Sequence, residues 1–231
     1  MVENIRAITR NTELVDTRRN QIVHHATKLF VEKGFAHTTM SEIAEHCDMG
    51  KGSLYNYVAS KEDIVYLILD YTQQVHGQSF AEINSRLSTL SVTDALRQAI
   101  QTYIKDVDEM QDEYNFLNHM VIGLEREGRR KMLGASVRVT DYFEVLLAKG
   151  VDTGEFKVEN PRLIGHLIGR MCSAWAHNRW FLGRLMSLDD FTKQLTDFIL
   201  KAIAVDQKVP PSTEPRVTRM KWGILRATRL D

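Results

Sequence analysis

The sequence has few cysteines and no long apolar run that is free of charge. Its two cysteines, Cys47 and Cys172, stand far apart in apolar segments without an obvious cationic neighbour. They favour a reduced, cytosolic chain with buried thiols over a disulfide-stapled secreted fold or a redox-sensing thiol. No signal peptide and no segment long and apolar enough to span a bilayer are evident, so we expect a soluble, cytoplasmic protein without a membrane partner.

Proline is also scarce, and it is confined to Pro161 and the segment from Pro210 onward. No segment alternates polar and apolar residues as a β-strand does, so we predict an all-α fold. Helical spacing of apolar residues, together with capping residues such as Ser91 and Ser187, predicts helices over about residues 18–34, 61–83, 91–107, 111–126, 129–149, 160–184 and 187–205.

Motifs for catalysis and metal binding are missing as well. There is no Gly-rich phosphate loop, Cys-x-x-Cys pair or recognisable nucleophile motif, and His24 and His25 face different ways on one helix. We therefore expect that the protein is not an enzyme and binds no cofactor and no metal. A helical enzyme with dispersed catalytic residues is the competing class. The formal net charge is +0, which counts mildly against nucleic-acid binding, although a DNA site needs only a local positive face.

The most informative stretch runs from Thr38 to Lys61. Thr39 and Glu42 form a predicted capping box, and the helix that they start is broken at residues 48–50. A second short helix is expected from Lys51 to Val58, and it leaves cationic, hydroxyl, amide and phenol side chains exposed. Two short helices around a glycine occur in many folds, so this spacing alone does not establish DNA binding.

The preceding segment adds to the pattern. An amphipathic helix over residues 18–34 ends in a Gly34-Phe35 corner, and Thr38-Thr39, the glycine turn, Leu54-Tyr55-Asn56-Tyr57 and Ser60-Lys61-Glu62 follow in order. Over residues 18–66 this arrangement resembles the DNA-binding domain of the tetracycline-repressor (TetR) family of transcriptional regulators. The rest of the chain agrees with that family in length and helical character.

The resemblance implies a set of DNA contacts. Thr38 and Thr39 would meet phosphate, and Tyr55 and Lys61 would also contact phosphate. Asn56 would read bases, and Tyr57 would contact backbone or base. The residues that would approach the bases at the start of the second helix are Lys51, Gly52 and Ser53. Three positions depart from the family pattern. Asp48 stands where glycine is usual, Gly50 replaces a frequent serine cap, and Val58 replaces a frequent phenylalanine. Aspartate visits left-handed conformations more readily than most residues, so the turn can tolerate Asp48.

The predicted organisation is an N-terminal extension (1–17), a three-helix DNA-binding domain with a helix-turn-helix (18–66), a helical effector-binding and dimerisation domain (67–205) and a disordered C-terminal tail (206–231). The helices over 160–184 and 187–205 are apolar on more than one side, which favours pairing with a second copy. Gly165 and Gly169 would let another helix approach closely, which we take as support for a homodimer, and Ile168 is a candidate for the seam.

An effector pocket is the second expected task of the helical body. Large side chains with polar tips lie among apolar ones, a mixture that suits an apolar pocket or simply a packed core: Tyr103, Phe116, His119, Met120, Tyr142, Phe143, Trp175 and His177. We expect a repressor that binds an inverted-repeat operator as a homodimer and is released by an acyl-coenzyme A or aromatic compound. An architectural or partner-recruiting DNA-binding protein without a ligand is the alternative.

Overall fold

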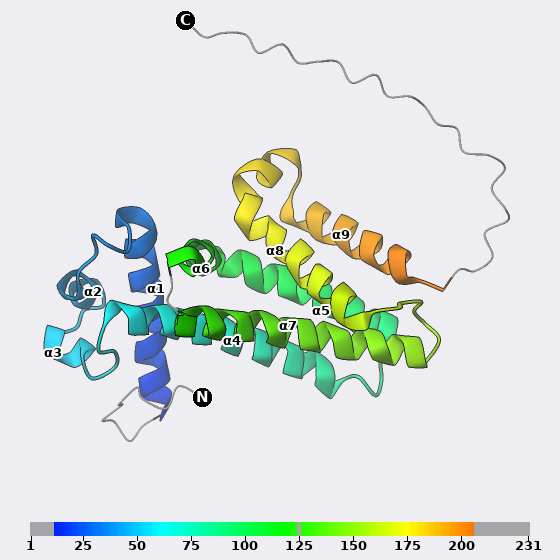
Figure 1. The fold of residues 1–231 in the computed structure, drawn as a ribbon, viewed down its shortest axis with the longest axis horizontal. Helices are drawn as coiled ribbons and strands as arrows, with labels where there is room; N and C mark the ends of the chain where they lie inside the picture. Colours follow the sequence, from blue (N-terminus) through cyan, green and yellow to red (C-terminus); the bar gives the residue numbers. More distant parts are fainter. Residues whose placement is uncertain (1–11, 124–125, 206–231) are drawn as a thin grey trace, which may run out of the picture.

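The computed structural model describes residues 12–123 and 126–205, and this part of the chain contains helices and no β-strand (Figure 1). The predicted all-α fold is confirmed. The helices are α1 (Thr12–Lys33), α2 (Met40–His46), α3 (Lys51–Leu54), α4 (Lys61–Ser85), α5 (Val92–Glu109), α6 (Gln111–Gly123), α7 (Arg126–Asp152), α8 (Pro161–Leu185) and α9 (Leu188–Ile203). The predicted tail, and the extension up to residue 11, lie outside the described residues.

Helix starts follow the capping chemistry of the sequence. A side-chain oxygen accepts a hydrogen bond from the backbone N–H three residues later at each predicted cap, which satisfies a donor that the helix itself leaves free. These caps are Thr39, Ser60, Ser91, Asn160 and Ser187.

Several boundaries differ from the prediction. Helix α1 begins at Thr12 and not at Arg18, and α3 ends at Leu54, four residues before the predicted end. Helix α7 continues through Gly128, where an interruption was expected. A glycine inside a helix costs only about 1 kcal/mol relative to alanine, so tertiary packing overrides it.

Two hydrophobic cores are built on opposite ends of α4. The first packs α1, α2 and α3 against Ile64 and Ile68 of α4, and Phe116 of α6 joins it. The second packs α5, α7, α8 and α9 around Phe80 and Ile83 of the same helix. Figure 1 shows α4 running without a break from the α2–α3 end into the body, beside α7. The boundary after residue 66 stays a prediction, because α4 belongs to both cores.

Two glycines of α8 allow a close approach, but to α7 of the same chain. A Cβ on Gly165 would lie 2.9 Å from the backbone nitrogen of Glu144 and 3.0 Å from the carbonyl oxygen of Thr140. A Cβ on Gly169 would lie 3.3 Å from Val139. The prediction that these glycines let another helix approach closely is confirmed, but that helix belongs to the same chain, so the glycines do not support a homodimer. Helical spacing does not reveal which neighbour a small residue faces.

Candidate nucleic-acid interface and central cavity

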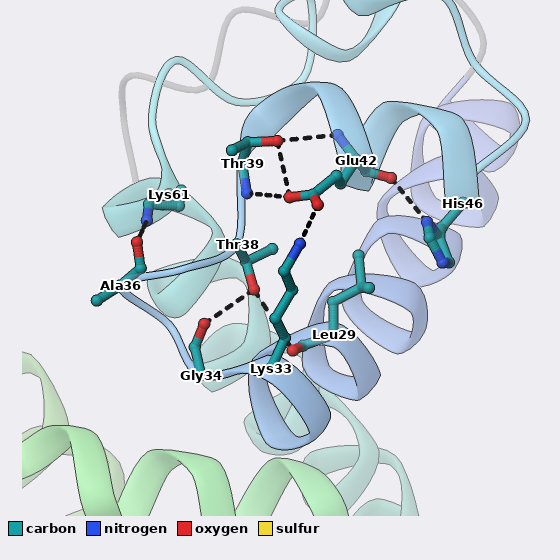
Figure 2. A network of polar contacts seen from close by, with 9 residues as sticks. All are labelled: Leu29, Lys33, Gly34, Ala36, Thr38, Thr39, Glu42, His46 and Lys61. Atoms are coloured by element: carbon teal, nitrogen blue, oxygen red, sulfur yellow. Dashed lines mark hydrogen bonds and ion pairs between the residues drawn. The ribbon is translucent and has the colours of Figure 1, made fainter.

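Helix α2 is fixed at its N-terminus by a polar network (Figure 2). Thr39 Oγ1 accepts from the Glu42 amide at 3.3 Å, and the Thr39 amide donates to Glu42 Oε2 at 2.8 Å, which confirms the capping box. Lys33, in the last turn of α1, forms an ion pair with the same carboxylate. Its hydrogen bond, with those from Thr39, lowers the pKa of Glu42 to about 2. The network ties the first helix of the motif to α1.

Thr38 has a different role from the one that the resemblance implies. Its side chain is 1% exposed, and its hydroxyl donates to the carbonyl of Gly34 at 2.9 Å, with Leu29 O at 3.4 Å (Figure 2). A buried hydroxyl that is already bonded to backbone cannot reach a phosphate. The predicted phosphate contact of the Thr38 side chain is therefore corrected to a structural bond that closes the corner after α1.

The turn between α2 and α3 uses the left-handed conformation expected of Asp48. Its φ is +52°, and the Met49 amide donates to the carbonyl of Ala44 at 2.9 Å. From α1, Gln21 Nε2 donates to the carbonyl of Cys47 at 2.9 Å, a contact that no local pattern in the sequence indicates. The turn is thus held from both sides, and it fixes the direction in which α3 leaves.

Helix α3 and the turn after it present side chains to solvent. Leu54 and Val58 are buried, and Tyr57, which was expected to be exposed, is half-buried against the first core. The exposed residues are Lys51, Gly52, Ser53, Tyr55 and Asn56. Within the described residues, none of these exposed side chains has a hydrogen-bond or ion-pair partner, so their donors and acceptors face outward unpaired.

Lys61, the first residue of α4, contacts the loop between α1 and α2. Its Nζ donates to the carbonyl of Phe35 at 2.7 Å and to that of Ala36 at 3.3 Å. Figure 2 draws the contact with Ala36. It also lies 4.7 Å from the centre of the Phe35 ring. Lys61 therefore fastens the start of α4 to the loop between α1 and α2.

A cavity of about 400 Å³ opens among α4, α5, α6, α7 and α8. Of the eight predicted effector residues, Tyr103 and His177 line it. The other lining residues are Leu69, Thr72, Gln73, Tyr114, Leu117, Asn118, Leu133, Ser136, Val139, Thr140, His166, Gly169, Arg170 and Ser173. This set contains one fully cationic side chain, Arg170, and no carboxylate.

The other six predicted residues do not line this cavity, so the prediction is corrected for them. Phe116 stacks on Phe30 at 4.9 Å in the first core, which Met120 also joins. The remaining four lie as follows: Phe143 is fully buried, Tyr142 stacks on Phe80 at 3.8 Å, Trp175 donates to Asp108 at 2.7 Å, and His119 is exposed. Residue type predicted a cavity among these helices, but it does not tell which turn of a helix faces it.

Behind the cavity wall lies a buried polar chain that the sequence did not indicate. His76 of α4, 2% exposed, binds Asp106 through Nδ1 at 3.1 Å and the Tyr114 hydroxyl through Nε2 at 2.5 Å. The Tyr114 and Tyr103 hydroxyls lie 3.2 Å apart, and both tyrosines line the cavity. Burial raises the pKa of both phenols, so they stay neutral and act as hydrogen-bonding groups. The chain links the cavity to α4.

The thiols fit the buried role expected of them. Cys47 and Cys172 are both buried, and burial raises the pKa of Cys47 to about 11. Within residues 12–123 and 126–205, no group of histidine, cysteine or acidic side chains is arranged to hold a metal ion. The same residues include no helix that is long and apolar enough to cross a membrane.

Comparison with known proteins agrees with this geometry. The family model described as bacterial regulatory proteins of the tetR family matches residues 22–66, and the model of the tetracyclin repressor-like C-terminal domain matches residues 89–203. Together they cover more than half of the chain. The chain belongs to the TetR family. It is a transcriptional regulator with a helix-turn-helix for DNA binding.

Relatives within the TetR family are similar over most of their length. The chain is 26% identical over 193 residues to the transcriptional regulator HbdR of Aromatoleum sp. (strain CIB), covering 83% of each chain. It is 28% identical over 193 residues to the repressor KstR2 of Rhodococcus jostii (strain RHA1), covering 81% of this chain and 91% of the relative.

Solved TetR-family structures share the fold. A TetR/AcrR-family regulator from Thermobifida fusca is 26% identical with a TM-score of 0.62, covering 80% of this chain and 97% of the other. AibR, solved with isovaleryl coenzyme A and operator DNA, is 21% identical with a TM-score of 0.61, covering 81% and 98%. The latter likeness concerns the fold alone.

Proposed function

We propose that this protein is a ligand-responsive repressor that binds an inverted-repeat operator as a homodimer. The main observation that supports DNA binding is a group of exposed residues on α3 and the turn after it: Lys51, Gly52, Ser53, Tyr55 and Asn56. Lys51 and Tyr55 suit phosphate contacts, and Asn56 suits bidentate recognition of adenine. Thr39 lies exposed at the start of α2, so it remains the candidate of the threonine pair for phosphate, although its hydroxyl would have to release the Glu42 carboxylate, to which it donates at 2.8 Å.

The apolar residues that α8 and α9 leave exposed support a dimer. Leu163 and Leu167 of α8 are 52% and 43% exposed, and Phe198 of α9 is 62% exposed. Side chains of this size on two adjacent helices form an apolar face, and such faces are usually covered by a partner. Ile168 is 0% exposed and packs in the chain's own core, so it is withdrawn as a seam residue.

The effector is proposed to occupy the central cavity. Its volume of about 400 Å³ lies within the usual range for small-molecule sites, which favours a ligand over an architectural role without one. Arg170 and the absence of a lining carboxylate suit a ligand with an anionic or carbonyl end. The isovaleryl coenzyme A in AibR supports testing acyl thioesters first.

Release from DNA is proposed to pass through α4. The chain from Tyr114 to His76 gives a bound ligand a way to change the setting of this helix, which carries the DNA-binding core at its other end. Half-sites in successive major grooves require a spacing near ~34 Å between recognition helices, so a tilt of α4 disfavours simultaneous contact. A ligand shifts this equilibrium only by its differential affinity for the two states.

The test begins with selection of operator DNA by the purified protein. Lys51→Ala should weaken binding to every sequence and flatten the logarithmic salt slope by ~0.9 for each phosphate contact that is lost. Asn56→Ala should also change base preference. If both variants bound the selected operator as the wild type does, the α3 surface would not be the DNA contact.

The effector is tested separately. Isovaleryl coenzyme A and aromatic thioesters are titrated into the protein–operator complex, with Arg170→Gln as the cavity variant. A ligand that binds tightly but leaves DNA affinity unchanged would contradict coupling through α4 and leave the DNA contact intact.

A further inference from the structure

The hydroxyl groups on the wall of the central cavity have no proton left for a ligand. Each of three aliphatic hydroxyls donates its single proton to a backbone carbonyl three or four residues earlier in its own helix, at 2.8, 2.9 and 3.1 Å: Thr72, Thr140 and Ser173. A hydroxyl group has one proton and two lone pairs. What these side chains still offer to a ligand is therefore an acceptor and not a donor.

His177 of α8 adds an acceptor that is free. Its Nδ1 lies 2.7 Å from the carbonyl oxygen of Ser173, and a carbonyl only accepts, so Nδ1 carries the proton. Burial lowers the pKa of His177, and the nearby charges of Arg170 and His119 lower it further, so the ring carries no charge at neutral pH. In a neutral ring with the proton on Nδ1, the other nitrogen, Nε2, is an acceptor.

Nε2 of His177 is both unpaired and accessible. Within residues 12–123 and 126–205 it has no hydrogen-bond partner, because the bond of this ring uses Nδ1. It is also not one of the side-chain atoms that are buried without a partner, so it keeps accessible surface. Since His177 lines the central cavity, a ligand bound there can donate a hydrogen bond to this nitrogen.

Tyr114 of α6 lies beside this acceptor. Its ring meets the ring of His177 edge to face, with the two centres 6.4 Å apart, and both residues line the cavity. Asp106 holds the proton of His76 on Nδ1, so Nε2 of His76 accepts the proton of the Tyr114 hydroxyl. The Tyr114 oxygen is then left with lone pairs only. This part of the cavity therefore lacks a hydrogen-bond donor that the ligand must supply.

The charges around the cavity favour a neutral donor over an ammonium group. No carboxylate is among its described lining residues, and the charge of Arg170 is close enough to affect the pKa of His177. An ammonium group would meet this like charge with no opposite charge to balance it. A hydroxyl group can donate to Nε2 without that cost. Arg170 precedes His177 by seven residues, or about 10 Å along α8 at 1.5 Å per residue, so an anionic end and a hydroxyl belong at separate ends of a ligand.

We infer that the effector carries a hydroxyl group that donates to Nε2 of His177, beside Tyr114, at the end remote from its carboxyl or thioester group. The inference rests on the proposed function, since it concerns the effector site proposed above, and it names the ligand class: a carboxylic acid or its thioester with a distant hydroxyl. Leu69, Leu117 and Val139 also line the cavity and suit an apolar middle part. His177 is then the residue that distinguishes hydroxylated from unhydroxylated ligands.

The test is calorimetric titration of the full-length protein without DNA at about pH 8, where an ordinary histidine (pKa ~6.5) is neutral and a phenol (pKa ~10) keeps its proton. Two matched pairs of acids are compared: 3-(4-hydroxyphenyl)propanoate with 3-phenylpropanoate, and 8-hydroxyoctanoate with octanoate. The hydroxylated acid of at least one pair should bind about three- to tenfold more tightly, as expected for one hydrogen bond. The methyl ether of the phenol, which has no proton to donate, should bind no more tightly than 3-phenylpropanoate.

His177→Phe keeps a ring at this position and removes the acceptor, so it should bring the affinity ratio of the pair to about one. His119→Phe is the matched control. His119 also uses Nδ1 to bond the carbonyl four residues earlier, that of Asn115 at 2.6 Å, but it does not line the cavity. This variant should keep the preference for the hydroxylated acid. Arg170→Gln should weaken binding of both members of a pair alike and leave their ratio unchanged.

The inference is overturned if neither hydroxylated acid binds more tightly than its partner. It is also overturned if the preference survives His177→Phe, or if His119→Phe removes it as His177→Phe does. The proposed function fails in a different way. A hydroxylated acid that shows the preference but leaves operator affinity unchanged would contradict release of DNA by the cavity ligand, while the hydroxyl assignment would stand. Acids that release the operator without any preference would support the proposed function and overturn the inference.

Discussion

Gly52 offers a test of the proposed DNA surface that does not disturb the fold. It is an exposed residue of α3, and a Cβ added there would meet no atom within 4 Å. Alanine in a helix is favoured over glycine by roughly 0.5–1 kcal/mol, so Gly52→Ala should leave the free protein as stable or more stable. If the backbone of α3 approaches DNA, the added methyl group should weaken operator binding by about tenfold, or ~1.4 kcal/mol.

Gly77 provides the control for this substitution. It is also an exposed helical glycine with open space around its Cα, but it lies on α4 in the body. Gly77→Ala should raise the unfolding midpoint in the same way and leave operator affinity unchanged. Chemical denaturation and a DNA-binding titration of both variants make the comparison, and equal operator affinity of the two would place Gly52 away from DNA.

The adjacent threonines show what residue types alone could predict. The capping box of Thr39 and Glu42 follows from local spacing, so the sequence predicted it correctly. The burial of Thr38 depends on the corner after α1, where Gly34 has a φ of +89° and turns its carbonyl toward the hydroxyl. That geometry comes from packing between α1 and α2, and no local pattern distinguishes the two hydroxyls.

At the scale of elements, the contact between α1 and α6 should depend on pH. His24 meets the buried Glu113 carboxylate at 3.3 Å, and Tyr71 of α4 lies at its other ring nitrogen, 3.4 Å away. The hydrogen bond to Glu113 raises the pKa of His24. A raised pKa stabilises the fold fully below the ordinary histidine pKa, and this stabilisation is lost as pH rises through the raised value.

His24→Gln should therefore be less stable than the wild type at about pH 5.5, below the ordinary pKa of ~6.5, and should approach it at about pH 9. The two proteins differ only at position 24, so the difference in stability between them isolates the contribution of the imidazole. Thermal unfolding at both pH values provides the measurement. A difference that grows with pH would show that His24 is neutral in the contact.

The starts of the helices with a side-chain cap were predictable, whereas the start of α1 was not, and helix faces were predictable only in part. Each predicted cap bonds to a backbone N–H only three residues later, so the residues that determine these helix starts are neighbours in the sequence. The lining of the central cavity depends on how five helices are rotated about their axes. Tyr103 and His177 were predicted to face it, whereas the chain from His76 to Tyr114 joins residues 38 positions apart. Contacts at that sequence separation have no signature in periodicity.

At the scale of the whole molecule, the proposed dimer can be tested with two neighbouring residues of α8. Leu167 is 43% exposed on the apolar face, whereas Ile168 is 0% exposed in the core of its own chain. Successive helical residues point about 100° apart, since the helix has 3.6 residues per turn. The same substitution at the two positions therefore places a charge either at the proposed seam or inside the monomer.

Leu167→Glu should give a folded monomer, because an exposed substitution changes monomer stability by about 0.5 kcal/mol or less, while an unpaired charge in a closed seam opposes association. Ile168→Glu should unfold the chain, because the carboxylate would be buried without a partner. Circular dichroism reports folding, and sedimentation velocity reports association. A folded Leu167→Glu variant that stayed dimeric would exclude this face of α8 from the seam. A monomeric variant should bind a single half-site far more weakly than the wild type binds the full operator, because it loses the gain from joining two half-sites.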